Sequence, residues 1–342
     1  MFLVIIGSKC KLHKNKIDSK YVIYNILNNK LIMTSQIYTA STISMNSMNS
    51  DSMNSEKTEL YPILNIRNAH PRDKNIHFEE EGHKYTILGE CGYTSVTTWI
   101  HTHFALFDAD LIISRMMSGK AWKAGHKYWG LTADGIKDLW DGKRDSAAGA
   151  GTKLHYEIEC FMNSNVLIFD YTHLELLQQY QIMSKYDKKY LDFGVEWSYF
   201  LKFVADFPQL KPYRTEWTVY HEDLKMAGSI DMVYENPDGS LSIYDWKRSA
   251  DIVKSNSWNK CAITKEIDWM PDSNFWHYAL QLNTYKMILE SKYDKIVKDL
   301  YLVRLHPDSS DYELIQVPEL KHDLLPLFPL LEKVEQKHTP LK

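Results

Sequence analysis

Cysteine is scarce in this chain of 342 residues, and its few copies stand far apart. They lack the paired spacing of a structural zinc site and the regular pattern of a disulfide-rich protein. The four positions are Cys10, Cys91, Cys160 and Cys261. This usage is typical of a reducing compartment. We therefore expect an intracellular protein, with cytoplasm, nucleus and mitochondrion left open.

Long apolar runs and an excess of basic residues are also missing. No apolar stretch approaches the roughly 20 residues of a membrane-spanning helix, so we expect no membrane partner. No Gly-x-x-x-x-Gly-Lys-Ser/Thr loop occurs, which argues against a fused ATPase motor and a nucleotide cofactor. The formal net charge is −4. A nucleic acid would therefore have to bind along a local groove, because the surface as a whole is not basic.

The chain divides by composition into a tail and one large domain. Residues 41–56 are almost entirely Ser, Met, Asn and Thr, a low-complexity composition typical of disorder. We therefore predict a disordered tail over residues 1–58 and a single domain over residues 59–342. Residues 1–32 are rich in Lys and Asn. They are open to three interpretations: a native tail, a targeting segment, or an extension ahead of a start at Met33.

The most informative segment runs from Gly228 to Lys247. Two apolar, β-prone runs flank the turn sequence Asn236-Pro237-Asp238-Gly239. This pattern predicts an antiparallel hairpin. If the register is centred on Asp238, Asp231 lies directly opposite Asp245.

Two acidic residues would then face each other across the hairpin. Facing residues have Cβ atoms about 4.5–5.5 Å apart, and like charges at that distance are destabilising. Aspartate is also depleted in strands, so this pair needs a reason. Lys247 stands two residues after Asp245 and therefore on the same face. Two carboxylates and an ammonium group on one face suit a divalent metal and a phosphate.

This hairpin resembles the core of the PD-(D/E)XK nuclease superfamily, in particular its RecB-like branch. That branch includes the mitochondrial genome maintenance exonuclease and the CRISPR-associated adaptation nucleases. Three further segments support the resemblance in the same chain order. They are a Gly-x-x-x-His motif at 151–155, a strand carrying Glu216, and a Gln-x-x-x-Tyr motif at Gln281 and Tyr285. The resemblance covers about residues 78–305, with its core motifs in 151–305.

The resemblance implies an α/β (α+β) fold with a restriction-endonuclease-like core, in which helices flank a central mixed sheet. From the residues themselves we expect the core strands at 214–221, 226–235, 241–247 and 298–305. We also expect a hairpin joining 83–88 to 93–98, separate helices over 134–140 and 145–163, and an amphipathic helix over 319–337.

The resemblance also implies roles for particular residues. Asp231, Asp245 and Lys247 are the catalytic candidates, and His155, Asp231 and Asp245 are the candidate metal ligands. Lys247 would hold the attacking water or the phosphate. Four further residues would support the metal ligands or contact the DNA backbone: Glu159, Glu216, Gln281 and Tyr285. For Glu216, an ordinary surface position on a strand is almost equally compatible with the sequence.

The chain has ten tryptophans, and most of them are expected in the core. Trp258 and Trp269 lie in a lysine-bearing loop after the hairpin. They are the candidates for stacking on bases, as aromatic side chains do in single-strand channels.

The implied function is a Mg²⁺- or Mn²⁺-dependent deoxyribonuclease, specifically an exonuclease in DNA recombination, repair or genome maintenance. The expected partners are single-stranded DNA or DNA ends, together with replication or recombination proteins. No iron–sulfur cluster is expected, because no cysteine follows Cys261. A structure-selective DNA endonuclease, an RNA endonuclease and a degenerate nuclease that only binds DNA are the alternatives.

Overall fold

A computed structural model describes residues 62–164, 170–185 and 194–328 of the chain. The chain divides into two units, residues 1–58 and residues 59–342, and the described residues all belong to the second. The predictions for the tail, including disorder over residues 41–56, therefore lie outside the described residues. Of the amphipathic helix expected over 319–337, residues 329–337 also lie outside them, and the described part has only a short helix at Lys321–Leu324 and a 3-10 turn at Leu325–Leu327.

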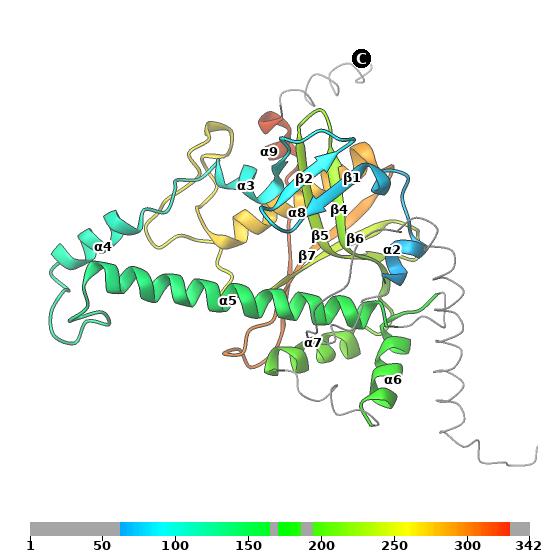
Figure 1. Ribbon diagram of the computed structural model, residues 1–342, viewed down its shortest axis with the longest axis horizontal. Coiled ribbons are helices and arrows are strands. Elements are labelled where there is room, and N and C mark those ends of the chain that lie inside the picture. Colours follow the sequence, from blue (N-terminus) through cyan, green and yellow to red (C-terminus); the bar gives the residue numbers. More distant parts are fainter. Residues whose placement is uncertain (1–61, 165–169, 186–193, 329–342) are drawn as a thin grey trace, which may run out of the picture. The chain divides into compact units, whose positions relative to one another are not determined.

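Six strands in the described part of the chain form a mixed central sheet (Figure 1). Their bounds are β3 (Thr94–Ser95), β4 (Lys211–His221), β5 (Met226–Glu235), β6 (Leu241–Lys247), β7 (Val297–Arg304) and β8 (Glu313–Gln316). The strand β5 is antiparallel to β4 and to β6. The pairs β3–β5 and β6–β7 are parallel, and β8 runs antiparallel to β7.

The hairpin formed by β5 and β6 has the predicted register, since Met232 pairs with Tyr244 and Glu235 with Leu241. Its turn is held by Asp238, whose Oδ1 accepts hydrogen bonds from the backbone N and the Oγ of Ser240. An aspartate in a turn commonly bonds its own backbone two residues on. The turn chemistry and the strand alternation therefore fix the same register.

Helices cover both faces of the sheet. On one face, α8 (Asn274–Lys292) and α3 (Val96–His101) pack with a core that includes Ile230 and Ile243. On the other face, α5 (Ala133–Met162), α6 (His173–Met183) and α7 (Val195–Asp206) pack with a core that includes Tyr244 and Trp246. Successive strand residues enter opposite cores, as strand geometry requires. The prediction of a mixed α/β fold with a central sheet between helices is confirmed.

The remaining described elements are short, apart from α4. They are α2 (Ile63–Arg67), η1 (Asp73–Asn75), β1 (Ile76–Glu79), β2 (Lys84–Ile87), α4 (Ala109–Ser118), η3 (Lys265–Ile267), α9 (Lys321–Leu324) and η4 (Leu325–Leu327). Within the described ranges, no helix combines the length and the apolar character needed to cross a bilayer.

Two expectations about the N-terminal half of the domain are wrong. The strand β2 pairs with β1, not with residues 93–98, and β3 instead joins the central sheet beside β5. The expected helices over 134–140 and 145–163 are one continuous helix, α5. Gly142 lies between the two expected ranges and Gly149 lies within the second, and glycine disfavours helix. The interior of α5 nevertheless stays helical through both residues.

Candidate active site

Three acidic side chains come from three neighbouring strands. Glu216 belongs to β4, Asp231 to β5 and Asp245 to β6. The pairs on either side of Glu216 put it next to Asp231, and the β5–β6 register, continued by one residue, puts Asp231 next to Asp245. We call Glu216, Asp231 and Asp245 the carboxylate row. Its formation from adjacent strands explains how residues 29 positions apart come together.

Glu216 has an unusual backbone conformation. Its φ of 42° lies in the left-handed region, which residues other than glycine seldom adopt. The ladder between β4 and β5 contains the pairs on both sides of Glu216 but not Glu216 itself. Its side chain is held by Ser229, whose Oγ donates to Oε2 at 3.0 Å. Strained backbone of this kind tends to concentrate at functional sites.

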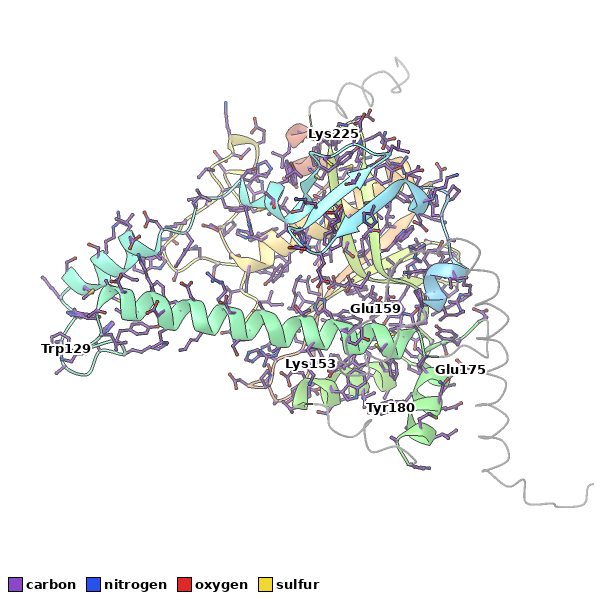
Figure 2. The ribbon with its side chains drawn as sticks, viewed as in Figure 1. Trp129, Lys153, Glu159, Glu175, Tyr180 and Lys225 are labelled. Carbon is purple, nitrogen blue, oxygen red and sulfur yellow. The ribbon has the colours of Figure 1, made fainter. Side chains whose placement is uncertain are left out.

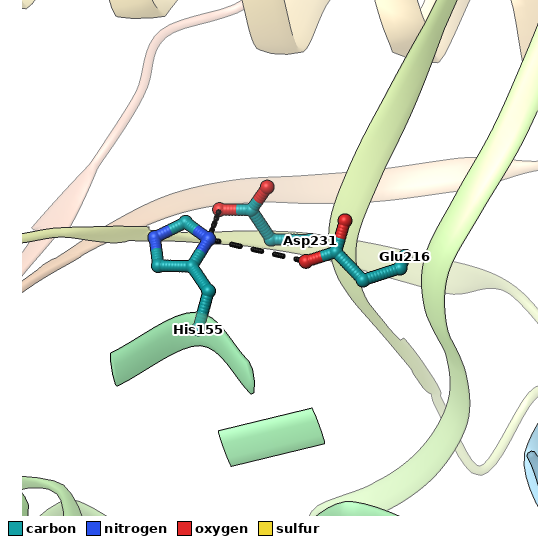
Figure 3. A group of neighbouring side chains, drawn as sticks. All are labelled: His155, Glu216 and Asp231. Carbon is teal, nitrogen blue, oxygen red and sulfur yellow. Dashed lines mark ion pairs between the residues drawn. The ribbon is translucent and has the colours of Figure 1, made fainter. Parts of the chain in front are cut away.

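His155 approaches the carboxylate row from α5 (Figure 3). Its Nε2 lies 2.9 Å from the backbone oxygen of Trp246. Its Nδ1 lies 3.6 Å from Oδ2 of Asp231 and 3.9 Å from Oε1 of Glu216. The three ligand atoms all lie within 4.8 Å of one another.

The hydrogen bond to Trp246 determines the tautomer of a neutral His155. A carbonyl oxygen only accepts, so Nε2 must carry the hydrogen. The Nδ1 lone pair of the neutral ring then faces two carboxylates. Metal-binding histidines commonly donate their other ring N–H to a backbone carbonyl in this way. Nδ1 and the two carboxylates thus form a donor set that fits Mg²⁺ or Mn²⁺.

Burial makes negative charge costly in the carboxylate row. It raises the pKa of Glu216 to about 8, with Asp231 and Glu159 adding to the effect. Burial also raises the pKa of Asp245 to about 6; Lys247 opposes this shift, and Asp231 adds to it. A bound cation would offset this repulsion between neighbouring carboxylates.

Lys247 provides a fixed positive charge at one end of the row. Its Nζ lies 2.6 Å from Oδ2 of Asp245 and 4.5 Å from the centre of the Tyr278 ring. Burial alone would lower the pKa of Lys247, but Asp245 and Asp231 raise it above its usual value. The side chain therefore stays charged although it is largely buried.

The structure redistributes the predicted metal ligands. It brings His155 and Asp231 together as expected, but the third member of their cluster is Glu216. Asp245 lies beside this cluster and is ion-paired with Lys247. From sequence alone, an ordinary surface position was almost equally compatible with Glu216. Its register opposite Asp231 is the signal that would have identified it.

Glu159 lies one turn beyond His155 on α5 (Figure 2). Burial raises the pKa of its carboxyl group. Among the described hydrogen bonds, none joins its carboxylate to His155, and the carbonyl of Trp246 orients the ring instead. A sequence motif could not have shown this contact, because the orienting group belongs to the backbone.

Gln281 and Tyr285 lie on α8, where the Gln281 amide is 3.4 Å from the Tyr285 hydroxyl. Tyr285 is only 3% exposed, which argues against the predicted contact with a DNA backbone. It packs against Gly228, at which an added Cβ would come within 2.7 Å of the Tyr285 ring. Tyr285 therefore braces β5 three residues before Asp231.

The two candidate stacking residues differ in their surroundings. Trp258 is 81% exposed, so its ring is available to a ligand. The indole N–H of Trp269 donates to Asp323 at 3.2 Å, and its ring meets Trp276 edge-on. Trp269 is nevertheless 48% exposed, so both tryptophans remain stacking candidates, and Trp269 is the one with contacts inside the fold.

No model of a known protein family matches this sequence, and no curated protein is significantly similar to it.

Proposed function

We propose that the protein is a metal-dependent nuclease that hydrolyses phosphodiester bonds of DNA, removing nucleotides from DNA ends. The observation that carries the proposal is the orientation of His155. Its Nε2 is committed to a backbone carbonyl, while Nδ1 faces Asp231 and Glu216. The restriction to DNA ends comes from the resemblance to RecB-like nucleases.

The donor set suits one class of cofactor. His155, Asp231 and Glu216 would hold a Mg²⁺ or Mn²⁺ ion, since carboxylate oxygens suit both and imidazole is better tolerated by Mn²⁺. Such an ion polarises a phosphoryl oxygen and lowers the pKa of a coordinated water. The imidazole in the set predicts higher activity with Mn²⁺ than with Mg²⁺ at equal occupancy. Equal activity would refute that preference.

Lys247 has the charge and position to act on the phosphate. Asp245 and the Tyr278 ring hold its ammonium group in place. A charge fixed before the substrate binds needs little reorganisation to stabilise negative charge that develops in the transition state. Asp245 therefore serves to position Lys247, and it also adds to the negative potential beside Asp231.

The test is cleavage of end-labelled linear single-stranded DNA, compared with a closed circle of the same sequence, with Mg²⁺ or Mn²⁺ added. Degradation of the linear form alone would support a nuclease that requires ends. Cleavage of both forms would indicate an endonuclease. Binding without cleavage of either form would refute the proposal for DNA, and RNA would then be the next substrate to test.

Two variants of the same hairpin make the test specific. Asp231→Asn keeps an oxygen for the hydrogen bond from Trp246 but removes the charge from the cluster. It should lower the cleavage rate at least about 100-fold. Asp238→Asn changes an acidic residue in the turn and should cleave normally. Lys247→Ala should still bind DNA but no longer cleave it. This result would separate a nuclease from a protein that only binds DNA.

A further inference from the structure

A basic segment precedes and joins the N-terminal end of α5, whereas the carboxylate row lies near the other end of this helix. Residues 111–133 contain four basic residues and no acidic one, in a chain whose net charge is −4. The four are Arg115, Lys120, Lys123 and Lys127. We call α4, the segment 119–132 and the first turns of α5 up to Trp140 the arm. Its charge is the reverse of the charge at the row.

These four cations are all exposed, and no acidic residue in the described part of the chain is paired with them. Among the ion pairs of the described residues, none includes any of them. The ion pair that joins α4 to α5 within the arm uses other residues, Asp110 and Lys137. The positive charge of segment 119–132 is therefore available to an external anion.

Aromatic rings lie among these cations. The Trp122 ring is 5.7 Å from that of Trp129, and Tyr128 accepts a hydrogen bond from the indole N–H of Trp140 at 3.1 Å. Lys127 lies over the Tyr128 ring. Trp129 is 49% exposed, and it lies near the end of the arm in Figure 2. The Tyr128–Trp140 hydrogen bond ties this aromatic cluster to α5. The ring of Trp129 stays open to a ligand.

One helix connects the arm to the candidate active site. All side chains from Asp141 to Gly149 are exposed, so this part of α5 runs through solvent between the arm and the packed domain (Figure 1). From Ala133 to His155 the helix rises about 33 Å. At the 3.4 Å spacing of stacked nucleotides, this length matches about ten nucleotides.

We propose that the arm binds single-stranded DNA, with phosphates on Lys120, Lys123 and Lys127 and bases stacked on Trp129. Unpaired cations beside exposed aromatic rings are the combination that binds single strands without sequence preference. An acidic protein segment would match the charge but has no regular supply of flat rings to stack. That the bound strand leads to the carboxylate row rests on the proposed nuclease function; binding itself does not.

Binding is tested without any divalent ion, so that cleavage plays no part. Fluorescence anisotropy of a labelled 20-nucleotide oligo-dT is measured in EDTA over a range of salt concentrations. We expect the triple variant Lys120→Gln, Lys123→Gln, Lys127→Gln to bind at least tenfold more weakly at 0.1 M salt. The slope of log K against log salt should become shallower by about 2, because each phosphate contact to a single strand contributes about 0.7.

A matched control removes the same charge elsewhere. Lys74→Gln, Lys84→Gln, Lys298→Gln changes three lysines outside the arm and should leave affinity and slope unchanged. Trp129→Ala should weaken binding about tenfold without changing the slope, because stacking involves no counterion release. Thermal melts confirm that each variant is folded. Binding of the triple arm variant equal to wild type would overturn the proposal, and so would an equal loss in the control.

Substrate length separates this inference from the proposed function. If the protein cleaves DNA, the triple arm variant should match wild type on a five-nucleotide substrate and fall behind on a 20-nucleotide one. Equal loss on both lengths would overturn the claim that the strand spans the distance to the row. If the protein cleaves nothing but the arm variant still loses binding, the proposed function fails and the arm remains a single-strand binding surface.

Discussion

The carboxylate row and the arm hold charge in opposite ways. In the row, acidic groups lie on the strands of the sheet, and burial raises the pKa of Glu216 and of Asp245. In the arm, basic groups are solvated, and four of them pair with no acidic group within the described ranges. The row therefore needs counter-charges inside the protein or from a bound ion, whereas the arm can leave its charges unpaired at little cost.

The difference follows from the cost of removing a charge from water. A buried charge is expensive unless it is paired, but its interactions are strong because the surroundings are poorly polarisable. An exposed charge is cheap, and salt screens it. The row is thus suited to act strongly on one bound group over a short distance. The arm is suited to attract a long polyanion weakly at many points.

The largest effect expected in the row comes from Lys247→Met. Removing one partner of a buried ion pair leaves Asp245 without compensation, which should lower the free energy of unfolding by about 3 to 5 kcal/mol. Urea denaturation at neutral pH measures it. Lys127→Met in the arm is the counterpart and should leave stability nearly unchanged. Similar losses in both variants would contradict the contrast between the two regions.

A double variant sharpens this result. Asp245→Leu combined with Lys247→Met removes both charges, and apolar replacement of a buried pair is often neutral or stabilising. We expect most of the lost stability to return while cleavage stays absent. Recovery of cleavage in the double variant would show that Lys247 has no part in the chemistry.

Metal binding should stabilise the protein through the row. A ligand at 100 times its Kd that binds only the folded state adds about 2.7 kcal/mol. Mn²⁺ should therefore raise the melting temperature, and His155→Ala should abolish most of the increase. His126→Ala changes a histidine of the arm and should keep it. A His155→Ala protein that gains as much as wild type would place the ion elsewhere.

The packing behind the row should be sensitive to one added methyl group. Gly228→Ala places a Cβ within 2.8 Å of the Tyr285 ring and hydroxyl, and overpacking of this kind costs about 1 to 3 kcal/mol. Gly142→Ala adds a methyl group to the exposed part of α5, where nothing lies within 4 Å, and should stabilise the helix slightly. Chemical denaturation should show a lower free energy of unfolding for Gly228→Ala and a slightly higher one for Gly142→Ala.

Acidification should act at a buried site outside both regions. Burial lowers the pKa of His173 to about 3, and its Nε2 lies 2.8 Å from the Tyr234 hydroxyl. Below about pH 6.5 the unfolded chain takes up a proton at this residue and the folded protein does not. Stability should therefore fall by up to about 1.4 kcal/mol per pH unit from pH 6.5 towards pH 4.

The variant His173→Gln isolates this contribution. Its unfolding free energy should lose less on acidification than that of wild type, whatever the difference between the two proteins at pH 7.5. Urea denaturation at pH 7.5, 6 and 5 gives both profiles. Parallel profiles would show that His173 is protonated in the folded state too.

Local patterns predicted the centre of the fold best. Strand alternation and turn chemistry act over a few residues, so the β5–β6 hairpin and its register could be inferred from sequence. The continuity of α5 could not, because glycine propensity is a weak preference that tertiary packing at both ends of a helix can override. The pairing of β3 with β5 depends on contacts more than 120 residues apart, which no local pattern encodes.

In the candidate site, too, residues in local motifs could be predicted and long-range contacts could not. Asp231, Lys247 and His155 stand in short motifs and could be named from sequence. The proximity of Glu216 depends on the register between β4 and β5, and the anchoring of His155 depends on a backbone carbonyl. The basic and aromatic residues of the arm stand close together in the sequence, between Arg115 and Trp129. The sequence could not show that, among the described ion pairs, Asp110 of α4 pairs with Lys137 of α5 and leaves those cations unpaired.

The continuity of α5 has a consequence for how its length can change. Each added or deleted residue turns everything before it by about 100° around the helix axis relative to His155, and moves it by about 1.5 Å. One or two extra residues in the exposed stretch would therefore point the arm away from its present side. About seven residues would complete nearly two turns and restore its direction. Natural variation in the length of α5 should therefore come in steps close to whole turns.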